Sequence, residues 1–335
     1  MNIASGPAAN DLCQYSTSRG LLLPEEAMLL SILISMSIAP KALSFDVSGT
    51  VGHPCSITSW IFEPPAPARA LLFAIPGGTY TKGYWHLEVP GRSGYSFAER
   101  MVAAGFAVTA VDNFGTGSST RPPSGDDAGL VAMADANAAV ALQLRSQFPG
   151  LPVIGVGHSM GAALAVLQQA RHRSFDYLAV LGYGYQPLAG LSEDLPDEQL
   201  LAESAARFSQ LLGPCPDGYY TVDRSMLRPQ FHFDDVPDDV VRADDAQATV
   251  LPRAAMHTVG AAPIWRPLAS TVDVPIFQGW GERDNTPDPH RDGAYFSSCP
   301  DYTLFVLPRS AHCHNFASTR QAMWDRLVAW AGAFS

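Results

Sequence analysis

Residues 152–171, which read PVIGVGHSMGAALAVLQQAR, decide the fold. The first part, Pro152–Gly157, is a short apolar run, which is typical of a strand buried on both faces. The last part, Gly161–Arg171, has the apolar composition of a packed helix. A buried strand that turns at once into a buried helix predicts an α/β fold.

The turn between these elements, Gly157-His158-Ser159-Met160-Gly161, matches the pattern G-x-S-x-G. The bend is so tight that side chains at Gly157 and Gly161 would collide with neighbouring backbone. Such a turn pushes the Ser159 hydroxyl out at the end of the sheet and places the N-terminus of the next helix beneath it. We therefore predict that Ser159 is a nucleophile, in preference to a structural serine in a glycine turn.

Strands and helices alternate on both sides of this turn. Continuous or alternating apolar runs predict strands, and longer runs with helical periodicity predict helices. The expected strands are Phe45–Val51, Ile57–Phe62, Ala70–Ile75, Phe106–Val111, Tyr177–Gly182, Val274–Trp280 and Thr303–Leu307. The expected helices are Tyr95–Ala104, Ala128–Gln147 and Gln321–Ala333. This alternation predicts a mainly parallel sheet with helices on both faces.

Two segments depart from the alternation. Residues 1–44 carry no clear strand pattern, and we expect an N-terminal extension there. Residues 185–270 are polar, acidic and helix-like, which predicts a lid inserted between two strands of the core. A continuation of the core through extra helices is the alternative for that segment. The predicted core comprises residues 45–184 and 271–335.

A serine nucleophile needs a general base. The loop after the last expected strand contains two histidines, His312 and His314. His312 stands nearer the strand end and is the predicted base, whereas His314 would support it or face the substrate. The pair could instead bind a metal, but no acidic partner motif supports this alternative, and we predict no metal site.

The imidazole needs a carboxylate that orients it and stabilises its protonated form. The expected strand Val274–Trp280 is followed by the residues GERDN, and we predict that Asp284 has this role. Glu282 lies too close to the strand end, and Asp288 lies beyond a proline. The order Ser, Asp, His along the chain is the one expected for this kind of turn.

The oxyanion of a tetrahedral intermediate needs two N–H donors. The backbone N–H of Met160, at the start of the helix, is the first predicted donor. The loop after Ala70–Ile75 reads PGGTY and should supply the second, because glycines let the backbone approach a substrate closely. We predict the N–H of Gly78 with Thr79 as its alternate, and a simple Gly-Gly turn is the structural alternative.

Four motifs resemble the α/β-hydrolase superfamily, from about residue 45 to the end of the chain. Pro76-Gly77-Gly78 stands where the family has His-Gly-Gly or His-Gly-x, and residues 112–118 resemble its Asp-x-x-Gly-x-Gly-x-Ser turn. The other two motifs are the nucleophile turn and the set of Asp284 and His312. The resemblance implies an eight-stranded, mostly parallel sheet with a lid after the sixth strand. Pro76 departs from the family pattern.

The predicted reaction is hydrolysis of an ester or lactone, which needs no cofactor. Aromatic residues near the oxyanion loop and in the lid indicate an apolar pocket for a small hydrophobic substrate. The residues expected to contact the substrate are Thr79, Tyr80, His158, Tyr219 and Trp265. Acyltransferases, lyases and weakly catalytic ligand-binding receptors share this scaffold and are the alternatives.

The composition limits the partners. A formal net charge of −11 makes nucleic acid a poor ligand, and the sequence is compatible with a homodimer. Five scattered cysteines without a CxxC pair predict reduced thiols in the cytoplasm. The apolar run Met28–Ala39 is too short to span a membrane. As a signal segment it would direct secretion, but Glu25 and Glu26 precede it where positive charge is expected.

Overall fold

Eight strands form one sheet in the computed structural model, which describes residues 39–187, 190–213 and 216–334. The strands are β1 (Lys41–Asp46), β2 (Ser56–Phe62), β3 (Leu71–Ile75), β4 (Ala107–Val111), β5 (Val153–His158), β6 (Tyr177–Leu181), β9 (Ile276–Gly281) and β10 (Tyr302–Leu307). Their spatial order is β1-β2-β4-β3-β5-β6-β9-β10. The six strands from β4 to β10 are parallel, whereas β2 runs antiparallel to both β1 and β4. The predicted eight-stranded, mostly parallel sheet is confirmed.

The central strands of the sheet are recognisable from their buried, mainly apolar residues. All five residues of β3 and of β4 are buried, because helices cover both faces of the sheet. In the register of the sheet, Ile75 pairs with Gly157 and His158 pairs with Leu181. The carboxyl ends of β3, β5 and β6 therefore meet at one edge, where a sheet of this kind binds ligands.

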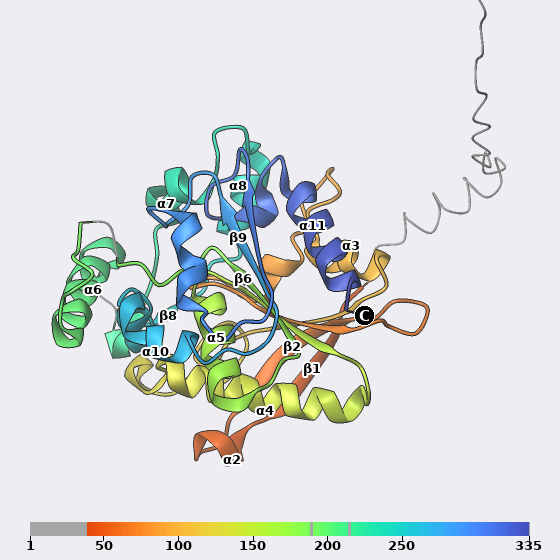
Figure 1. Ribbon diagram of the computed structural model, residues 1–335, viewed down its shortest axis with the longest axis horizontal. Helices are drawn as coiled ribbons and strands as arrows, with labels where there is room; N and C mark the ends of the chain where they lie inside the picture. The colour runs from red at the N-terminus through yellow and green to blue at the C-terminus, as the bar shows by residue number, and fades with distance from the viewer. Residues whose placement is uncertain (1–38, 188–189, 214–215, 335) are drawn as a thin grey trace, which may run out of the picture. The chain divides into compact units, whose positions relative to one another are not determined.

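Helices cover both faces of the sheet (Figure 1). One layer contains α3 (Phe97–Ala103) and α11 (Arg320–Gly332), and the other contains α4 (Leu130–Gln147) and α5 (Met160–His172). Of the thirteen residues of α5, the first ten are buried. Helix α5 therefore belongs to the hydrophobic core, as its apolar sequence predicted.

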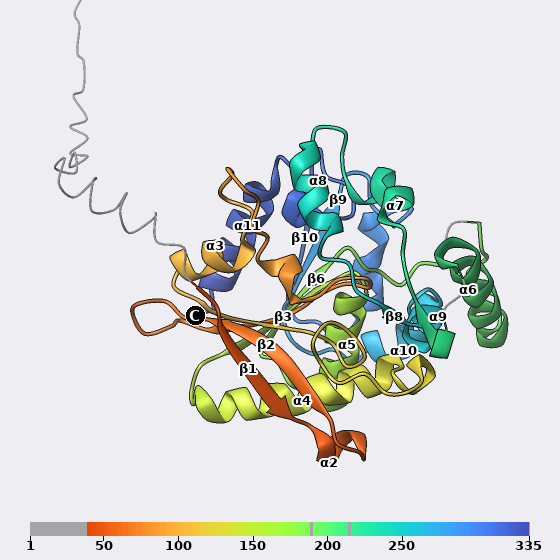
Figure 2. The ribbon, with the colours of Figure 1, turned by 180° about the vertical axis from the view of Figure 1, so that it is seen from behind.

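The segment between β6 and β9 is mainly helical and includes a second, two-stranded sheet. Its elements are α6 (Asp197–Leu212), β7 (Tyr219–Tyr220), α7 (Arg224–Phe231), α8 (Asp238–Asp245), β8 (Leu251–Pro252), α9 (Arg253–Val259) and α10 (Arg266–Ala269). Figure 2 shows α7 and α8 above the ends of the strands and α6 to one side. Helices α9 and α10 pack on α5, so the last part of the segment rests on the core. Its role as a lid stays a prediction.

Short helical turns complete the described structure. They are α2 (Ser48–Val51), η1 (Lys82–Trp85), η2 (Gly125–Asp127), η3 (Pro216–Gly218), η4 (Ala262–Trp265), η5 (Pro289–Tyr295) and η6 (His314–Phe316), where η marks a 3₁₀ helix. Two of them, η1 and η6, immediately follow loops that reach the candidate site.

The first strand corrects one prediction. Phe45–Val51 was expected to be a strand, but β1 ends at Asp46 and residues 48–51 form the helical turn α2. The Asp46 carboxylate accepts a hydrogen bond from the Ser48 N–H (2.9 Å), which favours the turn. Because β1 is an exposed edge strand, its sequence lacks the apolar pattern of a buried one. The extension predicted for residues 1–44 therefore ends before β1.

Most of the run Met28–Ala39 lies outside the described residues, as do Cys13 and Cys215. The cysteines that the structure does describe, Cys55, Cys299 and Cys313, are unbridged thiols. Among the described helices, none has the length and hydropathy that a membrane crossing requires.

Candidate active site

Ser159 is the single residue between β5 and α5, and its backbone angles are φ 54° and ψ −123°. A positive φ is costly for any residue other than glycine, so the surrounding structure must enforce it. A Cβ atom added to Gly161 would collide with the carbonyl oxygen of Ile75, and one added to Gly157 would collide with the backbone of α5. The Ser159 N–H donates to the Leu181 carbonyl (2.7 Å), which ties the turn to β6. The tight turn is therefore built by backbone packing.

Asp284 follows β9 and has a buried carboxylate between two histidines. His312 donates from Nδ1 to Oδ1 (2.6 Å), and His314 donates from Nε2 to Oδ2 (2.7 Å). The backbone N–H groups of Gly281 and Asn285 donate to the same carboxylate at 2.9 and 2.8 Å. Because its proton is on Nδ1, His312 keeps a lone pair on Nε2, which is the form a general base requires.

The surroundings of Asp284 favour the charged form of its carboxylate. Burial alone would raise the pKa of Asp284, but His312 and His314 outweigh it and hold that pKa well below its usual value. Burial, together with the neighbouring His312 and His314, lowers the pKa of His158 well below its usual range. His158 therefore stays neutral and donates from Nε2 to the His312 carbonyl (2.7 Å). Its ring stacks on Tyr84, with the centroids 4.4 Å apart.

The loop after β3 lies directly against the nucleophile turn. A Cβ atom added to Gly77 would lie only 3.1 Å from the Ser159 Cβ, so glycine allows this close approach without displacing the turn. The next residues are Gly78 and Thr79, and Thr79 has a φ of 69° although it is not glycine. This conformation is unusual for a β-branched residue and requires support from its neighbours.

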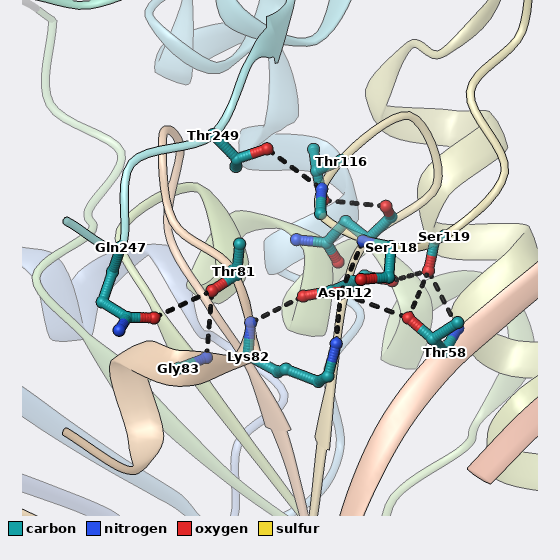
Figure 3. A network of polar contacts seen from close by, with 12 residues as sticks. Thr58, Thr81, Lys82, Gly83, Asp112, Thr116, Ser118, Ser119, Gln247 and Thr249 are labelled. Carbon is teal, nitrogen blue, oxygen red and sulfur yellow. Dashed lines mark hydrogen bonds and ion pairs between the residues drawn. The ribbon is translucent and has the colours of Figure 1, made fainter. Parts of the chain in front are cut away.

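The Asp112 loop provides part of that support (Figure 3). The buried Asp112 carboxylate accepts from the Lys82 ammonium (2.5 Å) and the Lys82 N–H (2.7 Å), just after the β3 loop. A Cβ atom on Gly117 would collide with this carboxylate, which explains the glycine in that motif. From the other side, Thr249 of the inserted segment accepts from the Gly117 N–H at 3.1 Å. The two loops and the insertion are thus joined by polar contacts.

A cavity of about 550 Å³ opens above these groups, within the size range of small-molecule sites. Ser159, His312, Gly78 and Met160 all line it. Its remaining walls are mostly apolar and come largely from the inserted segment: Phe208, Leu211, Leu212, Leu227, Phe231, Leu251, Met256, Val259 and Ala262. The proposed nucleophile, base and oxyanion donors therefore share one cavity.

Comparisons with known proteins give the family. Residues 71–328 match the model of the alpha/beta hydrolase family. The chain belongs to this family.

Solved structures of hydrolases agree with this assignment at the level of the fold. A soluble variant of monoglyceride lipase from Saccharomyces cerevisiae has a TM-score of 0.66 at 11% identity, covering 90% of this chain and 96% of its own. An esterase from Thermogutta terrifontis has a TM-score of 0.62 at 16% identity, covering 88% of this chain and 98% of its own. A carboxyl esterase from Bacillus coagulans has a TM-score of 0.60 at 18% identity, covering 89% of this chain and 99% of its own. A comparison with curated protein sequences finds no match.

In this α/β hydrolase, the substrate-contact predictions divide into two groups. Thr79, Tyr80 and His158 line the cavity. Tyr219 and Trp265 do not, which corrects the prediction for both. The Tyr219 hydroxyl donates to the Pro122 carbonyl (2.8 Å), and the Trp265 indole donates to the Thr258 carbonyl (3.1 Å). The Tyr219 hydroxyl is thus bound to a loop of the core, and the Trp265 indole to the backbone of the insertion itself.

The inserted segment of the α/β hydrolase also contains polar residues that its sequence did not single out. Asp244 is fully buried and accepts from Tyr80, His232 and Arg224. The exposed Asp239 instead pairs with Arg92. Composition alone does not distinguish the two aspartates, because both stand in the same short helix, α8.

Proposed function

We propose that this protein is a serine hydrolase that cleaves a carboxylic ester or lactone of a small hydrophobic substrate through an acyl-enzyme on Ser159. The observation that carries the proposal is the buried Asp284–His312 pair, whose imidazole lines the same cavity as Ser159. The esterases and lipases of similar fold support hydrolysis in general.

In the proposed mechanism, Nε2 of His312 takes the Ser159 proton while the hydroxyl oxygen attacks the substrate carbonyl. Asp284 stabilises the imidazolium that forms. The N–H groups of Gly78 and Met160 bind the oxyanion, and the N-terminal end of α5 adds a favourable dipole. The imidazolium then gives its proton to the leaving alcohol, and water repeats the sequence on the acyl-enzyme.

The walls of the cavity support the substrate class. Leu251 lies next to Gly78, where an added Cβ would be 3.4 Å from its side chain, and Met256 follows at 3.8 Å. An acyl group bound at the proposed oxyanion site would therefore meet apolar side chains. Burial of each methylene contributes about 0.8 kcal/mol, so longer acyl chains should bind better until the cavity is filled.

The test combines turnover with covalent labelling. The purified full chain is assayed with p-nitrophenyl acetate, butyrate and octanoate, and a fluorophosphonate probe is mapped by mass spectrometry. We expect turnover and a single label on Ser159. Ser159→Ala should lose both, whereas Ser146→Ala, which removes an exposed hydroxyl on α4, should keep both. Full turnover by Ser159→Ala would refute the nucleophile, and labelling without turnover would favour a binding protein.

A further inference from the structure

The inserted segment places a buried arginine against the loop that follows β3. Arg224 is the first residue of α7, and only 4% of its side chain is exposed. Its guanidinium lies 4.0 Å from the centre of the Tyr80 ring, and Nη1 lies 3.5 Å from the buried Asp244 carboxylate. A buried cation needs such partners, because removing it from water is costly.

Arg224 also donates a hydrogen bond to the residue with the unusual backbone. Its Nη2 donates to the Thr79 carbonyl at 2.9 Å, and the Thr249 N–H donates to the same oxygen at 3.0 Å. The carbonyl of Thr79, at φ 69°, is thus held by two donors, both from the inserted segment. Because Thr79 directly follows Gly78, holding its carbonyl restrains the backbone next to the Gly78 N–H.

The neighbouring contacts make the arrangement rigid. The Tyr80 hydroxyl donates to Asp244 at 3.0 Å, so the residue after Thr79 is fixed as well. At the other end of α7, the Gln230 and Phe231 carbonyls accept from the N–H groups of His312 and Cys313 at 3.0 and 2.9 Å. One short helix therefore contacts both the proposed oxyanion loop and the proposed base loop.

We infer that Arg224 is a positioning residue for the oxyanion site: its hydrogen bond to Thr79 and its stacking on Tyr80 hold the Gly78 N–H in place for a developing negative charge. The inference rests on the proposed function. It means that α7 is part of the catalytic framework.

The experiment measures the rate at which a fluorophosphonate labels Ser159, since this reaction also places negative charge at the oxyanion site. Arg224→Met keeps the apolar stem and removes the guanidinium, and with it the contacts to the Thr79 carbonyl, the Tyr80 ring and the Asp244 carboxylate. We expect its labelling rate and its kcat for p-nitrophenyl butyrate to fall together by about 10–100-fold, with KM changed less than about threefold, because one oxyanion donor is worth about 10²–10³-fold. Arg224→Lys should fall between Arg224→Met and the wild type.

The matched control is Arg228→Met, one turn along the same helix, where the guanidinium pairs with Asp245 at the surface. It should keep the wild-type labelling rate. A second variant separates positioning from folding: in the Thr79→Gly background, the loss caused by Arg224→Met should shrink, because glycine adopts φ 69° without support. If Arg224→Met does not fold, the comparison of Arg224→Lys with the wild type decides.

Three results would overturn the inference. The first is a labelling rate within twofold of the wild type in folded Arg224→Met, or in Arg224→Lys where that variant decides. The second is an equal loss in Arg228→Met, and the third is an undiminished loss in the Thr79→Gly background. If the wild type itself is not labelled at Ser159, the proposed function is wrong and this inference fails with it, which distinguishes the two failures.

Discussion

Two buried aspartates, Asp284 and Asp292, show how differently one residue type behaves in one molecule. The side chains of both are inaccessible to solvent. Asp284 accepts four hydrogen bonds, two of them from imidazoles, and its pKa lies well below the usual value. Asp292 accepts two long ones at Oδ1, from the Gln186 amide (3.2 Å) and the Tyr185 N–H (3.4 Å). Its Oδ2 has no hydrogen-bond partner among the described residues, and burial raises the pKa of Asp292 to about 6.

The difference teaches that burial does not by itself set the charge of a carboxylate. Burial disfavours the charged form of both residues, and the number and charge of the donors decide the outcome. Asp284 stays charged because His312 and His314 face it. Asp292 lacks such partners, so burial prevails there. Four substitutions test this difference between the two carboxylates.

The largest effect is expected for Asp284→Asn. The amide can no longer stabilise an imidazolium on His312 and favours the wrong tautomer, so kcat for p-nitrophenyl butyrate should fall on the order of 10⁴-fold. The control is Glu282→Gln, whose exposed carboxylate accepts a hydrogen bond from the Arg309 N–H in the loop after β10. It should stay within twofold of the wild type. If Glu282→Gln lowered kcat as much as Asp284→Asn does, the assignment of the orienting carboxylate to Asp284 would be contradicted.

Asp292→Asn should stabilise the folded protein, whereas Asp284→Asn should impair catalysis. The folded-state pKa of about 6 lies above the unfolded value of about 3.9, so the folded protein binds more protons between these pH values. The free energy of unfolding of the wild type should therefore fall as pH rises from about 4 to about 6. Asp292→Asn removes this penalty and should be about 3 kcal/mol more stable at pH 8 in urea unfolding. Equal free energies of unfolding for the wild type and Asp292→Asn at pH 8 would contradict this prediction.

His314→Phe removes one donor from Asp284 and leaves His312 intact. Of the two hydrogen bonds to Oδ2 of Asp284, the one from the Gly281 N–H then remains. A hydrogen bond to a charged group contributes roughly 1.5–3 kcal/mol, so we expect kcat to fall about tenfold with KM nearly unchanged. His312→Phe is the comparison and should lose activity almost completely. If the two variants lost activity equally, the assignment of the base to His312 would need revision.

The smallest effect is expected at an exposed aspartate of the same protein. Asp239→Asn breaks the pair with Arg92, in which both side chains are more than a third exposed. Water already solvates such groups, so the pair contributes little. The melting temperature should change by no more than about 2 °C. A larger drop would show that ion pairs hold the insertion to the core.

Much of the fold could be predicted because buried parallel strands carry their own signal. The residues LLFAI of β3 are all apolar and AVTAV of β4 contains a single polar residue, Thr109, so the positions of both strands were predicted to within one or two residues. The edge strand β1 was misplaced because solvent on its open side removes that pattern. The positions of Asp284 and His312 after β9 and β10 followed from the order of the strands.

The environment of the site could not be predicted in the same way. Asp244 and Asp239 belong to one helix, yet one is buried beside Arg224 and the other faces solvent. Tyr219 and Trp265 looked like pocket residues, but their polar atoms bind backbone carbonyls elsewhere. These outcomes depend on contacts between residues far apart in the chain.

The sequence by itself determined the sheet and the tight turn at Ser159, because apolar runs and obligatory glycines act on their immediate neighbours. Only the tertiary structure decided which carboxylate is charged, which arginine is buried against Thr79 and which aromatic rings face the cavity. The physical reason is that desolvation and hydrogen-bond partners are properties of a place in the folded molecule, and distant segments supply them together.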